Sequence, residues 1–465
     1  MINPTIEALR EALGEAQVLT EPARLDERRH DYWMVSHLRD RGATPAPRPA
    51  AVVRPRSVAD VQATLRLANA RGTPVIPFGL GSGVVGGVIA RPDAILLDMS
   101  AMDGVRSIDP INLLASFDAG KNGAEAEAAV AAQGLTIGHW PQSVAISSVG
   151  GWIATRASGQ FSTAYGNIED IVHSIEAVLP NGDLVVLGKG PRASAGPDLR
   201  NIIMGSEGAL GVVTGVTVSL RRAPEASALS AFEAPDMRTG FALQREMIQS
   251  GWTPPVVRQY DERESRRLDG RLSKCAILMV HEGPAGLVEA EVAAVAALAA
   301  KMQVAPAPAD IVEHWLDHRN NVPPWDGILD RNMVADTVEI SAAWDRIESV
   351  YVDAVTSLKE IPGCLAASAH SSHVYRSGLN LYFTFAVLPP DPADMESAYF
   401  EAWKRILEAT ERHGGSLSHH HGIGRVRRGY MERELGATGA ALLRTIKQAI
   451  DPNGIMNPGV LIPDA

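Results

Sequence analysis

The stretch from Gly79 to Gly87, "GLGSGVVGG", limits the fold more than any other part of this sequence, because five of its nine residues are glycine. It follows a pattern of strand, helix and strand: a short β-branched run at 51–55, a helix that begins after Ser57 and ends at Gly72, and a strand at 73–79. Such glycine density lets successive backbone N–H groups turn toward one anion. We therefore expect a phosphate-binding loop, with a merely flexible turn as the alternative.

The same loop satisfies the spacing GxGxxG between Gly81 and Gly86, so a nicotinamide-binding fold has to be considered. In that fold the last glycine opens a helix whose N-terminus holds the pyrophosphate, and an acidic residue follows about twenty positions later. Here Pro92 and the early start of the next strand, at 94–100, leave no room for such a helix. A dinucleotide other than NAD is the ligand that the loop favours.

The rest of the chain predicts two domains. Two β-rich runs and a helix follow the loop, and the turn pair Asn181-Gly182 joins two alternating strands in a hairpin. From Ala223 onward, helices interrupted by proline and tryptophan indicate a second, substrate-facing domain, and a helix near 436–452 finishes the chain. We predict an N-terminal helical segment at 1–46, a first domain at 47–222, a second domain at 223–415, and a C-terminal segment at 416–465 that returns to the first domain.

The composition narrows the class of partner. The chain has 465 residues, of which 46% are hydrophobic and 21% charged, and its net charge of −11 argues against nucleic-acid binding, which needs basic surface. A small molecule is the expected partner. Glu289 and Glu291 interrupt the longest apolar stretch, which predicts a surface helix rather than a membrane span. With two cysteines, no CxxC spacing and no signal-like start, we expect a cytoplasmic protein.

Several motifs carry a resemblance to a known family. Placed after its strand–helix–strand unit, "PFGLGSGVVGG" resembles the pyrophosphate loop of the vanillyl-alcohol-oxidase family, and "SSVGGWIATRASG" and "GPRASAGPDLRNIIMGSEGALGVV" are similar to two further FAD-binding segments of that family. Within it, "SAAWDR", "LYFTFA" and "GGSLSHHHGIGR" look most like the alkylglycerone-phosphate synthases. The resemblance implies an α+β protein: a PCMH-type FAD-binding domain of two subdomains, and an α+β substrate (cap) domain with a central antiparallel sheet.

Carried over residue by residue, the resemblance also implies which residues contact FAD. Glycines there permit close backbone approach, and short hydroxyl side chains supply donors. The loop holds no histidine or cysteine at a usual flavin-linking position, so we expect FAD without a covalent bond. The implied cofactor-binding residues are Pro77, Phe78, Gly79, Leu80, Gly81, Ser82, Gly83, Gln142, Ser143, Ser147, Ser148, Gly151, Thr155, Arg156, Ala157, Ser158, Glu207, Gly208, Gly211 and Val213.

Three adjacent histidines, His419, His420 and His421, stand in "SLSHHHGIGR". The resemblance implies that this triplet lies beside the flavin, that Tyr382 acts as an acid, and that Arg258 is also needed. Physical chemistry agrees, since a neutral imidazole can take a proton at neutral pH and an arginine can hold an anionic group. If the segment is extended, His419 and His421 share one wall and His420 points away. A solvated loop is the alternative to a catalytic one.

A metal site is a further alternative. His370 and His373 in "AHSSHVY" stand three residues apart, and with the triplet they could assemble a divalent-cation site. Related FAD-dependent 2-hydroxy-acid dehydrogenases bind a metal nearby through motifs like "GDGNLH" and "GEHG", which this chain lacks. We therefore predict no metal, and name His370 and His373 as the candidate ligands if one binds.

The substrate-binding end departs from the synthase pattern. Those enzymes hold the substrate phosphate with an arginine in a "YIRD" segment, and Trp325 stands at that place here. Arg319 and Arg331 are candidate replacements, whereas a tryptophan favours an apolar or aromatic group. The ending "IMNPGVL" is also more like the hydroxy-acid dehydrogenases. We name Trp325, Arg319 and Arg331 as the candidate substrate-binding residues.

Three functions remain open at this point. An FAD-dependent oxidoreductase would oxidise a hydroxy acid or alcohol by hydride transfer to flavin N5. A synthase-type enzyme would form an ether bond through an N5 adduct, without net redox change. A flavin-binding protein without turnover is the third. The sequence identifies neither the substrate nor the electron acceptor, and it leaves open whether the chain forms a homodimer.

Overall fold

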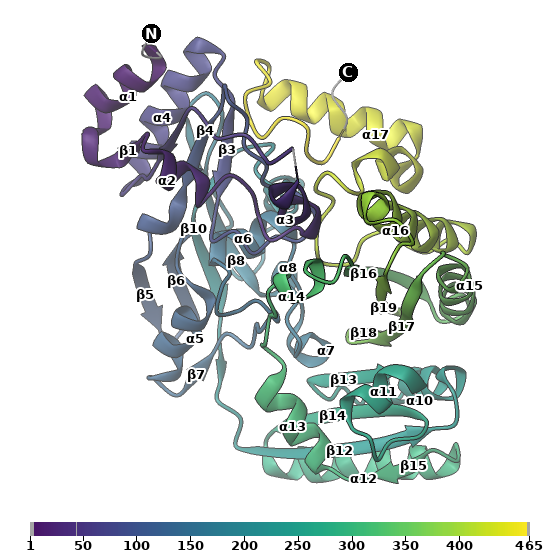
Figure 1. The fold of residues 1–465 in the computed structure, drawn as a ribbon. Helices are drawn as coiled ribbons and strands as arrows, with labels where there is room; N and C mark the ends of the chain where they lie inside the picture. The colour runs from purple at the N-terminus through teal and green to yellow at the C-terminus, as the bar shows by residue number, and fades with distance from the viewer. Residues whose placement is uncertain (1–3, 43, 463–465) are drawn as a thin grey trace.

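The computed structural model describes residues 4–42 and 44–462, which form two α+β units with a cavity between them (Figure 1). The first unit, at the purple and blue end of the chain in Figure 1, contains two sheets. One has the strand order β1-β2-β4-β3, in which only the β1–β2 pair is antiparallel. Its strands are β1 (Val18–Leu19), β2 (Ala51–Val53), β3 (Val75–Phe78) and β4 (Ile95–Asp98).

The second sheet of this unit is antiparallel, with the strand order β5-β6-β10-β8-β9. Helices of the same unit cover and connect the two sheets. The strands are β5 (Val105–Asp109), β6 (Leu114–Asp118), β8 (Val172–Val178), β9 (Leu184–Leu187) and β10 (Val212–Ser219), with β7 (Leu135–Thr136) and β11 (Arg221–Arg222) as a separate pair. The helices are α4 (Val58–Arg71), α5 (Gly123–Ala131), α6 (Val149–Thr155), α7 (Ser162–Tyr165), α8 (Ile168–Ile171), α9 (Arg200–Ile203) and the 3-10 turn η2 (Met99–Ala101).

Local sequence signals account for several of these elements. Helix α4 begins with a capping box, in which the Ser57 side chain accepts from the Asp60 N–H and the Asp60 carboxylate accepts from the Ser57 N–H. It ends at Gly72, whose φ of 62° is left-handed. The predicted hairpin also forms: Gly182 has a φ of 83°, and β8 and β9 pair on either side of the turn.

The second unit, the cap domain, is built on one eight-stranded antiparallel sheet with the order β15-β12-β14-β13-β17-β19-β16, to which β18 adds beside β19. The proline- and tryptophan-containing stretch at 251–260 leads into strand β13, in which every residue of "VVRQY" is buried. The strands are β12 (Ala226–Ala234), β13 (Val256–Tyr260), β14 (Cys275–Gly283), β15 (Ala305–Ala307), β16 (Val334–Ala343), β17 (Cys364–Ser371), β18 (Val374–Tyr375) and β19 (Gly378–Val387).

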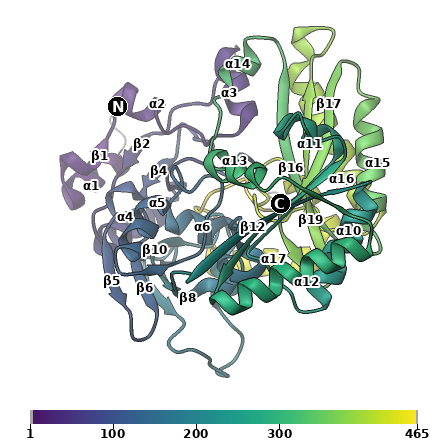
Figure 2. The same cartoon turned by 90° about the horizontal axis from the view of Figure 1, so that it is seen from below.

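Helices pack along this sheet, as the view from below shows (Figure 2). The Ala-rich stretch forms helix α12, which packs on β12 and β14 as a sheet-covering helix. The helices are α10 (Met237–Gln249), α11 (Glu262–Leu268), α12 (Ala285–Lys301), α13 (Asp310–His318), α14 (Asp326–Leu329), α15 (Ile347–Lys359) and α16 (Met395–Arg412), with η3 (Pro392–Asp394) before α16. No helix among residues 4–42 and 44–462 is both long and apolar enough to cross a membrane.

The N-terminal segment joins both units. Besides the helices α1 (Pro4–Leu13), α2 (Pro22–Asp26) and α3 (Met34–Arg41) and the turn η1 (Glu15–Gln17), it contributes β1 to the first sheet, so it is less purely helical than we expected. Trp33 is buried in the core of the cap domain, where its indole N–H donates to the Tyr399 hydroxyl at 2.9 Å. The segment therefore links the two units.

The C-terminal segment returns to the first unit. After the histidine stretch come η4 (Arg428–Tyr430) and α17 (Met431–Ile450), which is kinked at Gly436. The chain then runs beside β3, where the Val75 N–H donates to the Ile455 carbonyl and the Asn457 N–H donates to the Val75 carbonyl. The Asn457 amide side chain donates to the backbone carbonyls of Gly87 and Glu207. Residues from both ends of the chain thus complete the first unit.

Candidate active site

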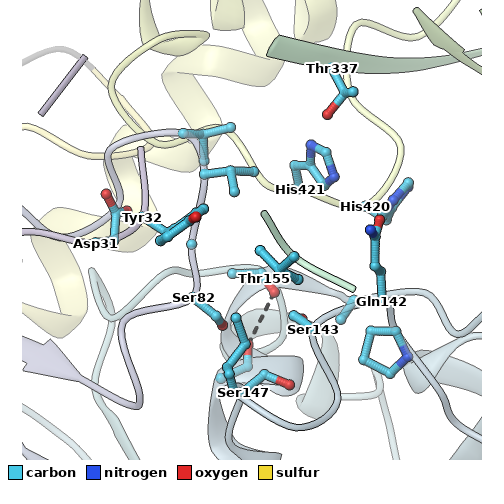
Figure 3. A pocket seen from close by; sticks show the side chains of 18 of the residues that line it. Asp31, Tyr32, Ser82, Gln142, Ser143, Ser147, Thr155, Thr337, His420 and His421 are labelled. Carbon is cyan, nitrogen blue, oxygen red and sulfur yellow. Dashed lines mark hydrogen bonds between the residues drawn. The ribbon is translucent and has the colours of Figure 1, made fainter. Parts of the chain in front are cut away.

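A large cavity of about 960 Å³ lies between the two units, at the upper end of the size range of small-molecule sites. The glycine loop, the start of α6 and the segment around Glu207 form its floor, while β13, β16, β17 and β19 of the cap domain form the opposite wall. Figure 3 shows Ser82, Ser143, Ser147 and Thr155 on the floor, with His420, His421 and Thr337 facing them. The cavity is therefore built from segments far apart in the sequence.

The glycine loop needs its glycines for two different reasons. Gly81 and Gly86 have φ values of 75° and 72°, which side chains with a Cβ rarely adopt. At Gly79 a Cβ would stand 2.5 Å from the Ser148 Oγ at the N-terminus of α6. The loop reaches β4 without a helix, which agrees with the exclusion of a Rossmann loop. It forms an open cradle of backbone that a dinucleotide phosphate fits.

The start of α6 supplies the second part of the floor. Ser148 caps the helix by accepting from the Gly151 N–H, and the Thr155 hydroxyl donates to the Gly151 carbonyl at 3.0 Å. The Ser147 hydroxyl accepts from the indole N–H of Trp152 at 2.9 Å. These bonds fix the small polar side chains that face the cavity.

Nineteen of the twenty residues expected to contact FAD line this cavity. The exception is Arg156, whose side chain is about half exposed and pairs with Glu169 at 3.2 Å. Its left-handed backbone, with a φ of 53°, ends α6 and directs the side chain to that partner. Arg156 therefore shapes the end of the helix without lining the cavity.

Glu207 connects the floor to the histidine segment. It is buried, and its two carboxylate oxygens accept from the backbone N–H groups of Ile423 at 2.6 Å and Gly424 at 2.8 Å. Burial raises the pKa of Glu207 to about 7, against the opposing effect of these two hydrogen bonds. One carboxyl group thus holds the C-terminal segment against the cofactor side of the cavity.

Tyr382 stands on β19 at the centre of the cap-side wall. Its hydroxyl lies 3.1 Å from His421 Nε2 and accepts from the Thr337 hydroxyl at 3.0 Å. Its ring lies between the imidazoles of His370 and His420, at centroid distances of 5.0 and 5.7 Å. Burial raises the pKa of Tyr382 well above its ordinary value, so the phenol keeps its proton at neutral pH.

The histidine segment bends around one buried carboxylate. Glu339 on β16 is paired with Tyr382 in the sheet register, and its Oε1 accepts from the backbone N–H groups of His419, His420 and His421 at 3.3, 3.0 and 2.6 Å. Its Oε2 accepts from the guanidinium of Arg427. Although burial alone would raise the pKa of Glu339, the charge of Arg427 and these N–H groups hold it below its usual range.

This geometry corrects the prediction that His419 and His421 share one wall. Three successive N–H groups cannot converge on one oxygen from an extended strand, whose amides alternate in direction. His420 and His421 line the cavity instead, whereas His419 turns away and its Nε2 lies 2.6 Å from the Tyr375 hydroxyl. Burial lowers the pKa of His421 and brings that of His419 to about 4, so both imidazoles are neutral at pH 7.

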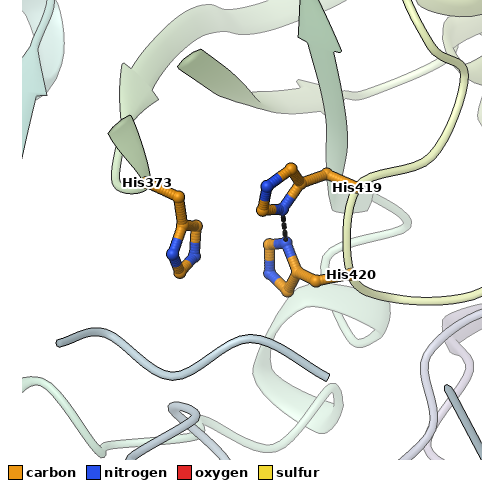
Figure 4. Close-up of side chains that lie close together, drawn as sticks. All are labelled: His373, His419 and His420. Carbon is orange, nitrogen blue, oxygen red and sulfur yellow. Dashed lines mark hydrogen bonds between the residues drawn. The ribbon is translucent and has the colours of Figure 1, made fainter. Parts of the chain in front are cut away.

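A cluster of three imidazoles lies beside Tyr382: His373, His419 and His420, each with a ring nitrogen within 4.8 Å of the others (Figure 4). Hydrogen bonds already engage several of these nitrogens. His373 Nδ1 lies 2.6 Å from the Ser162 hydroxyl, and the Nδ1 atoms of His419 and His420 are 2.8 Å apart. Neutral imidazoles in this arrangement would suit a divalent cation as well. Our expectation that no metal binds stays a prediction.

His370, the other candidate ligand, has a different partner. Its Nδ1 lies 2.7 Å from the carboxylate of the buried Glu264. It therefore belongs to a hydrogen-bonded contact with Glu264 at the wall of the cavity and not to the three-imidazole cluster.

Four more expected site residues lie on the cap side or beside it. Arg258 on β13, Arg319 after α13 and Trp325 line the cavity. The Trp325 indole N–H donates to the Tyr32 carbonyl at 2.9 Å, and the two rings pack with centroids 5.6 Å apart. Arg331 is not among the lining residues, so of the two arginine candidates Arg319 is the one placed to meet a ligand.

Sequence reasoning missed several lining residues, notably Asp31, Tyr32, Trp315 and Thr337. Asp31 accepts from the Val88 N–H at 3.2 Å and so fastens the glycine loop, and burial raises its pKa to about 7. Only the aromatic cluster "DYW" at Asp31–Trp33 could have pointed to this segment. Nothing near in sequence marks the other two.

Comparison with known proteins assigns the family. A model described as FAD binding domain matches residues 49–188, and a model described as FAD linked oxidases, C-terminal domain, matches residues 223–461. The chain belongs to the FAD-linked oxidases. As a member of that family it is an FAD-linked oxidoreductase, which confirms the predicted cofactor and enzyme class.

Relatives of this FAD-linked oxidase span nearly its whole length. The uncharacterized FAD-linked oxidoreductase YgcU of Escherichia coli K12 is 33% identical over 98% of both chains. The alkyldihydroxyacetonephosphate synthase of Dictyostelium discoideum is 30% identical over 89% of this chain and 73% of its own.

Solved structures confirm the predicted fold class. An alkyldihydroxyacetonephosphate synthase superimposes with a TM-score of 0.82 at 26% identity, covering 98% of this chain and 86% of its own. A p-cresol methylhydroxylase, at 16% identity over 98% and 95%, shares the fold with a TM-score of 0.77. The α+β arrangement of a PCMH-type domain with an antiparallel cap sheet is therefore shown.

Proposed function

We propose that this FAD-linked oxidase oxidises the hydroxyl-bearing carbon of a hydroxy acid or alcohol. The observation that supports this is the Tyr382 hydroxyl 3.1 Å from His421 Nε2, with both side chains lining the cavity. Bound FAD would accept a hydride from the substrate carbon. The chain itself then has to accept the hydroxyl proton, which is the task that a positioned acid–base pair performs.

The protonation states of the pair suit that task. His421 is neutral because burial lowers its pKa, and the Tyr382 phenol is protonated because burial raises its pKa. Tyr382 can therefore donate its proton to His421 Nε2 as its oxygen receives the substrate proton. The Thr337 hydroxyl, which donates to the Tyr382 oxygen, would stabilise that oxygen during the transfer.

The floor of the cavity is the proposed FAD site. The backbone from Pro77 to Gly83 would hold the pyrophosphate, and the small residues from Ser147 to Ser158 would let the flavin lie close to the chain. The glycine positions where a Cβ would clash, Gly79 and Gly208, support close packing of this floor. The FAD is expected to be non-covalent, so denaturation should release it into the supernatant.

Anaerobic mixing with a panel of hydroxy acids and alcohols tests the proposal. A substrate should bleach the flavin absorbance without any added reductant, because the hydride leaves the substrate carbon. If no member of a broad panel bleaches it, the oxidase assignment loses its support. Mixing the reduced protein with oxygen, quinones or a partner flavoprotein then identifies the electron acceptor.

Ether-bond formation is the second candidate. It is favoured by Tyr382 and the histidine triplet, which match the synthase motifs, and by the 30% identity to the Dictyostelium synthase. The tryptophan at position 325, where the synthase motif has an arginine, disfavours it. Incubation with acylated dihydroxyacetone phosphate and a fatty alcohol should yield an ether and a free fatty acid if this candidate is right. Absence of fatty-acid release would exclude it.

Location and assembly are also proposals. We infer a cytoplasmic protein, because both cysteines, Cys275 and Cys364, are free thiols, as is usual in a reducing compartment. Cell fractionation tests the location. Light scattering of the purified holoenzyme distinguishes a monomer from a homodimer.

A further inference from the structure

Two arginines on the cap side of the cavity have no acidic partner. Arg258 is buried and its Nε donates to the Tyr260 hydroxyl at 2.9 Å. Arg319 donates from Nη1 to the Gln160 side-chain oxygen at 2.9 Å, and its buried Nε has no hydrogen-bond partner. Within residues 4–42 and 44–462, no carboxylate oxygen lies within 4.0 Å of either guanidinium. Arg258 is buried and Arg319 partly buried, and cations in such places rarely lack a counter-charge because this costs free energy.

Aromatic rings surround the same two side chains. The Arg258 guanidinium lies 5.2 Å from the Trp315 ring centroid and 5.4 Å from that of Tyr260. The Arg319 guanidinium lies 5.2 Å from Phe161 and 6.0 Å from Trp315. Trp315 therefore contacts both cations. Such faces stabilise guanidinium groups without neutralising their charge.

The two charges act on each other. Burial lowers the pKa of Arg319, and the positive charge of Arg258 lowers it further, while Glu282 opposes this from beyond ion-pair distance. Glu282 already accepts from the Tyr165 hydroxyl at 2.6 Å. Two like charges close together in a partly desolvated cavity repel each other unless an anion enters. The two positive charges therefore favour the binding of an anionic ligand in the cavity.

Arg319 is also held rigidly across the domain boundary. Gln160, a buried residue of the first unit, accepts from the Arg319 guanidinium through its side-chain oxygen. Its side-chain amide donates to the Arg319 carbonyl at 3.1 Å. Gln142 donates to the nearby Asn321 carbonyl at 2.9 Å. A pre-oriented guanidinium loses little conformational entropy on binding a ligand.

We propose that Arg258 and Arg319 form an oxyanion subsite that holds a carboxylate or phosphate of the substrate against the Trp315 ring. The inference rests on the proposed function, because it narrows the substrate from alcohols in general to alcohols that carry an acidic group. Arg258 connects the subsite to the reacting side chains through a contact chain: Tyr260 packs on His370 at 5.2 Å, and His370 packs on Tyr382 at 5.0 Å. The acidic group thus lies on the cap side of the hydroxyl that Tyr382 meets.

Ligand binding without turnover tests the subsite. Holoenzyme is titrated with benzoate, phenyl phosphate and the neutral analogue benzamide, and binding is read from tryptophan fluorescence and the flavin spectrum. At least one of the two anions should bind tenfold or more tightly than benzamide. Their relative affinities show whether the subsite is suited to carboxylate or phosphate. Equal affinity for benzamide and both anions would overturn the proposal.

Matched variants assign the effect to these residues. Arg319→Gln and Arg258→Gln should each weaken anion binding by about tenfold or more, and Arg319→Lys should restore part of it. Arg331→Gln, a charge-matched control outside the cavity, should bind as the parent does. Unchanged affinity in both glutamine variants would contradict the subsite.

Folding is measured in the same samples. Removing an unpaired buried charge is not expected to lower the unfolding temperature, and the anion should raise it in the parent but not in Arg319→Gln. If a variant loses FAD, Gln160→Ala serves in its place, since it frees the Arg319 side chain without removing its charge. That variant should weaken anion binding to a smaller degree, and a full parental affinity would argue against pre-orientation.

The two proposals fail in different ways. If anions bind through the arginines but no hydroxylated substrate bleaches the flavin, the oxidase assignment falls and the subsite stands. If neutral alcohols bleach the flavin as fast as their acidic counterparts in the parent and in both glutamine variants, the oxidase assignment stands and the subsite falls.

Discussion

His421 and His419 stand two residues apart, yet their imidazoles reach different partners. His421 Nε2 lies 3.1 Å from the Tyr382 hydroxyl at the cavity, whereas His419 Nε2 lies 2.6 Å from Tyr375 outside it. A proton acceptor has to lie within hydrogen-bond reach of the proton that it takes. Only the first of these two residues meets that condition through Tyr382.

Replacing His421 with alanine should therefore lower the rate constant of anaerobic flavin reduction by about 10²- to 10⁴-fold. The His419→Ala variant should lose much less, about tenfold or below, because it removes a supporting contact and not the acceptor. Stopped-flow absorbance with the flavin content of each variant measured beforehand gives the comparison. Equal losses in the two variants would contradict the assigned roles.

The three-imidazole cluster beside Tyr382 is where a metal would bind, and we expect the enzyme to work without one. His373, His419 and His420 bring nitrogens within 4.8 Å of one another, but the Nδ1 atoms of all three already have hydrogen-bond partners, namely Ser162 and one another. Incubation with EDTA followed by gel filtration should leave the rate of flavin reduction unchanged. Elemental analysis should find less than one zinc, manganese or iron per chain; a stoichiometric metal lost together with activity would refute this expectation.

At the scale of elements, one strand positions the whole histidine segment. Glu339 on β16 receives three backbone N–H groups from the segment and pairs with Arg427, and both side chains are almost fully buried. The pKa of Glu339 is lowered in the fold from its ordinary value of 4.5. Its ionised form therefore stabilises the protein above about pH 4.5, and that stabilisation is lost as the pH falls further.

The Glu339→Gln variant should be destabilised by about 3 to 5 kcal/mol at pH 7, since it leaves the buried Arg427 without its counter-charge. The loss should shrink as the pH is lowered toward 4, where Glu339 of the parent begins to lose its advantage. Thermal unfolding at pH 7, 5 and 4 measures both effects. An exposed pair offers the control: Glu348→Gln, which removes the partner of Arg238, should change stability by less than about 1 kcal/mol. A pH-independent loss would contradict the ionised role of Glu339.

These elements also show what sequence can and cannot predict. The capping box of Ser57 and Asp60 and the turn at Asn181-Gly182 are encoded by neighbouring residues, so both were predictable. The bend of the histidine segment was not, because the carboxylate that causes it lies 82 positions away from His421. Without that partner, the local sequence offers only the alternation of an extended chain, which gave the wrong orientation for His420.

For the whole molecule, the cavity depends on both units together. All but one of the residues predicted to contact FAD line the cavity. They were predictable because the motifs that contain them are long and contiguous. Asp31, Tyr32 and Trp315 come from other parts of the chain and were missed, since tertiary packing alone brings them to the cavity. The family likeness therefore predicted the floor well and the cap-side wall incompletely.

A ligand that binds between the two units should stabilise both at once. Adding FAD to protein stripped of flavin should raise the unfolding temperature, by the equivalent of about 2.7 kcal/mol at a concentration one hundred times its dissociation constant. NAD should give no shift, because the glycine loop runs into β4 without the helix that NAD requires. Differential scanning calorimetry measures both. Equal shifts with the two nucleotides would reopen the nicotinamide interpretation.

The return of the C-terminal segment to β3 has a consequence for synthesis. Asn457 supports the glycine loop through the Gly87 carbonyl, 370 positions earlier in the chain. At translation speeds of 5 to 20 residues per second, roughly 20 to 70 seconds pass between the synthesis of these two residues. The first unit emerges from the ribosome long before its last backbone partner exists, so its cofactor cradle is completed only after nearly the whole chain has been made.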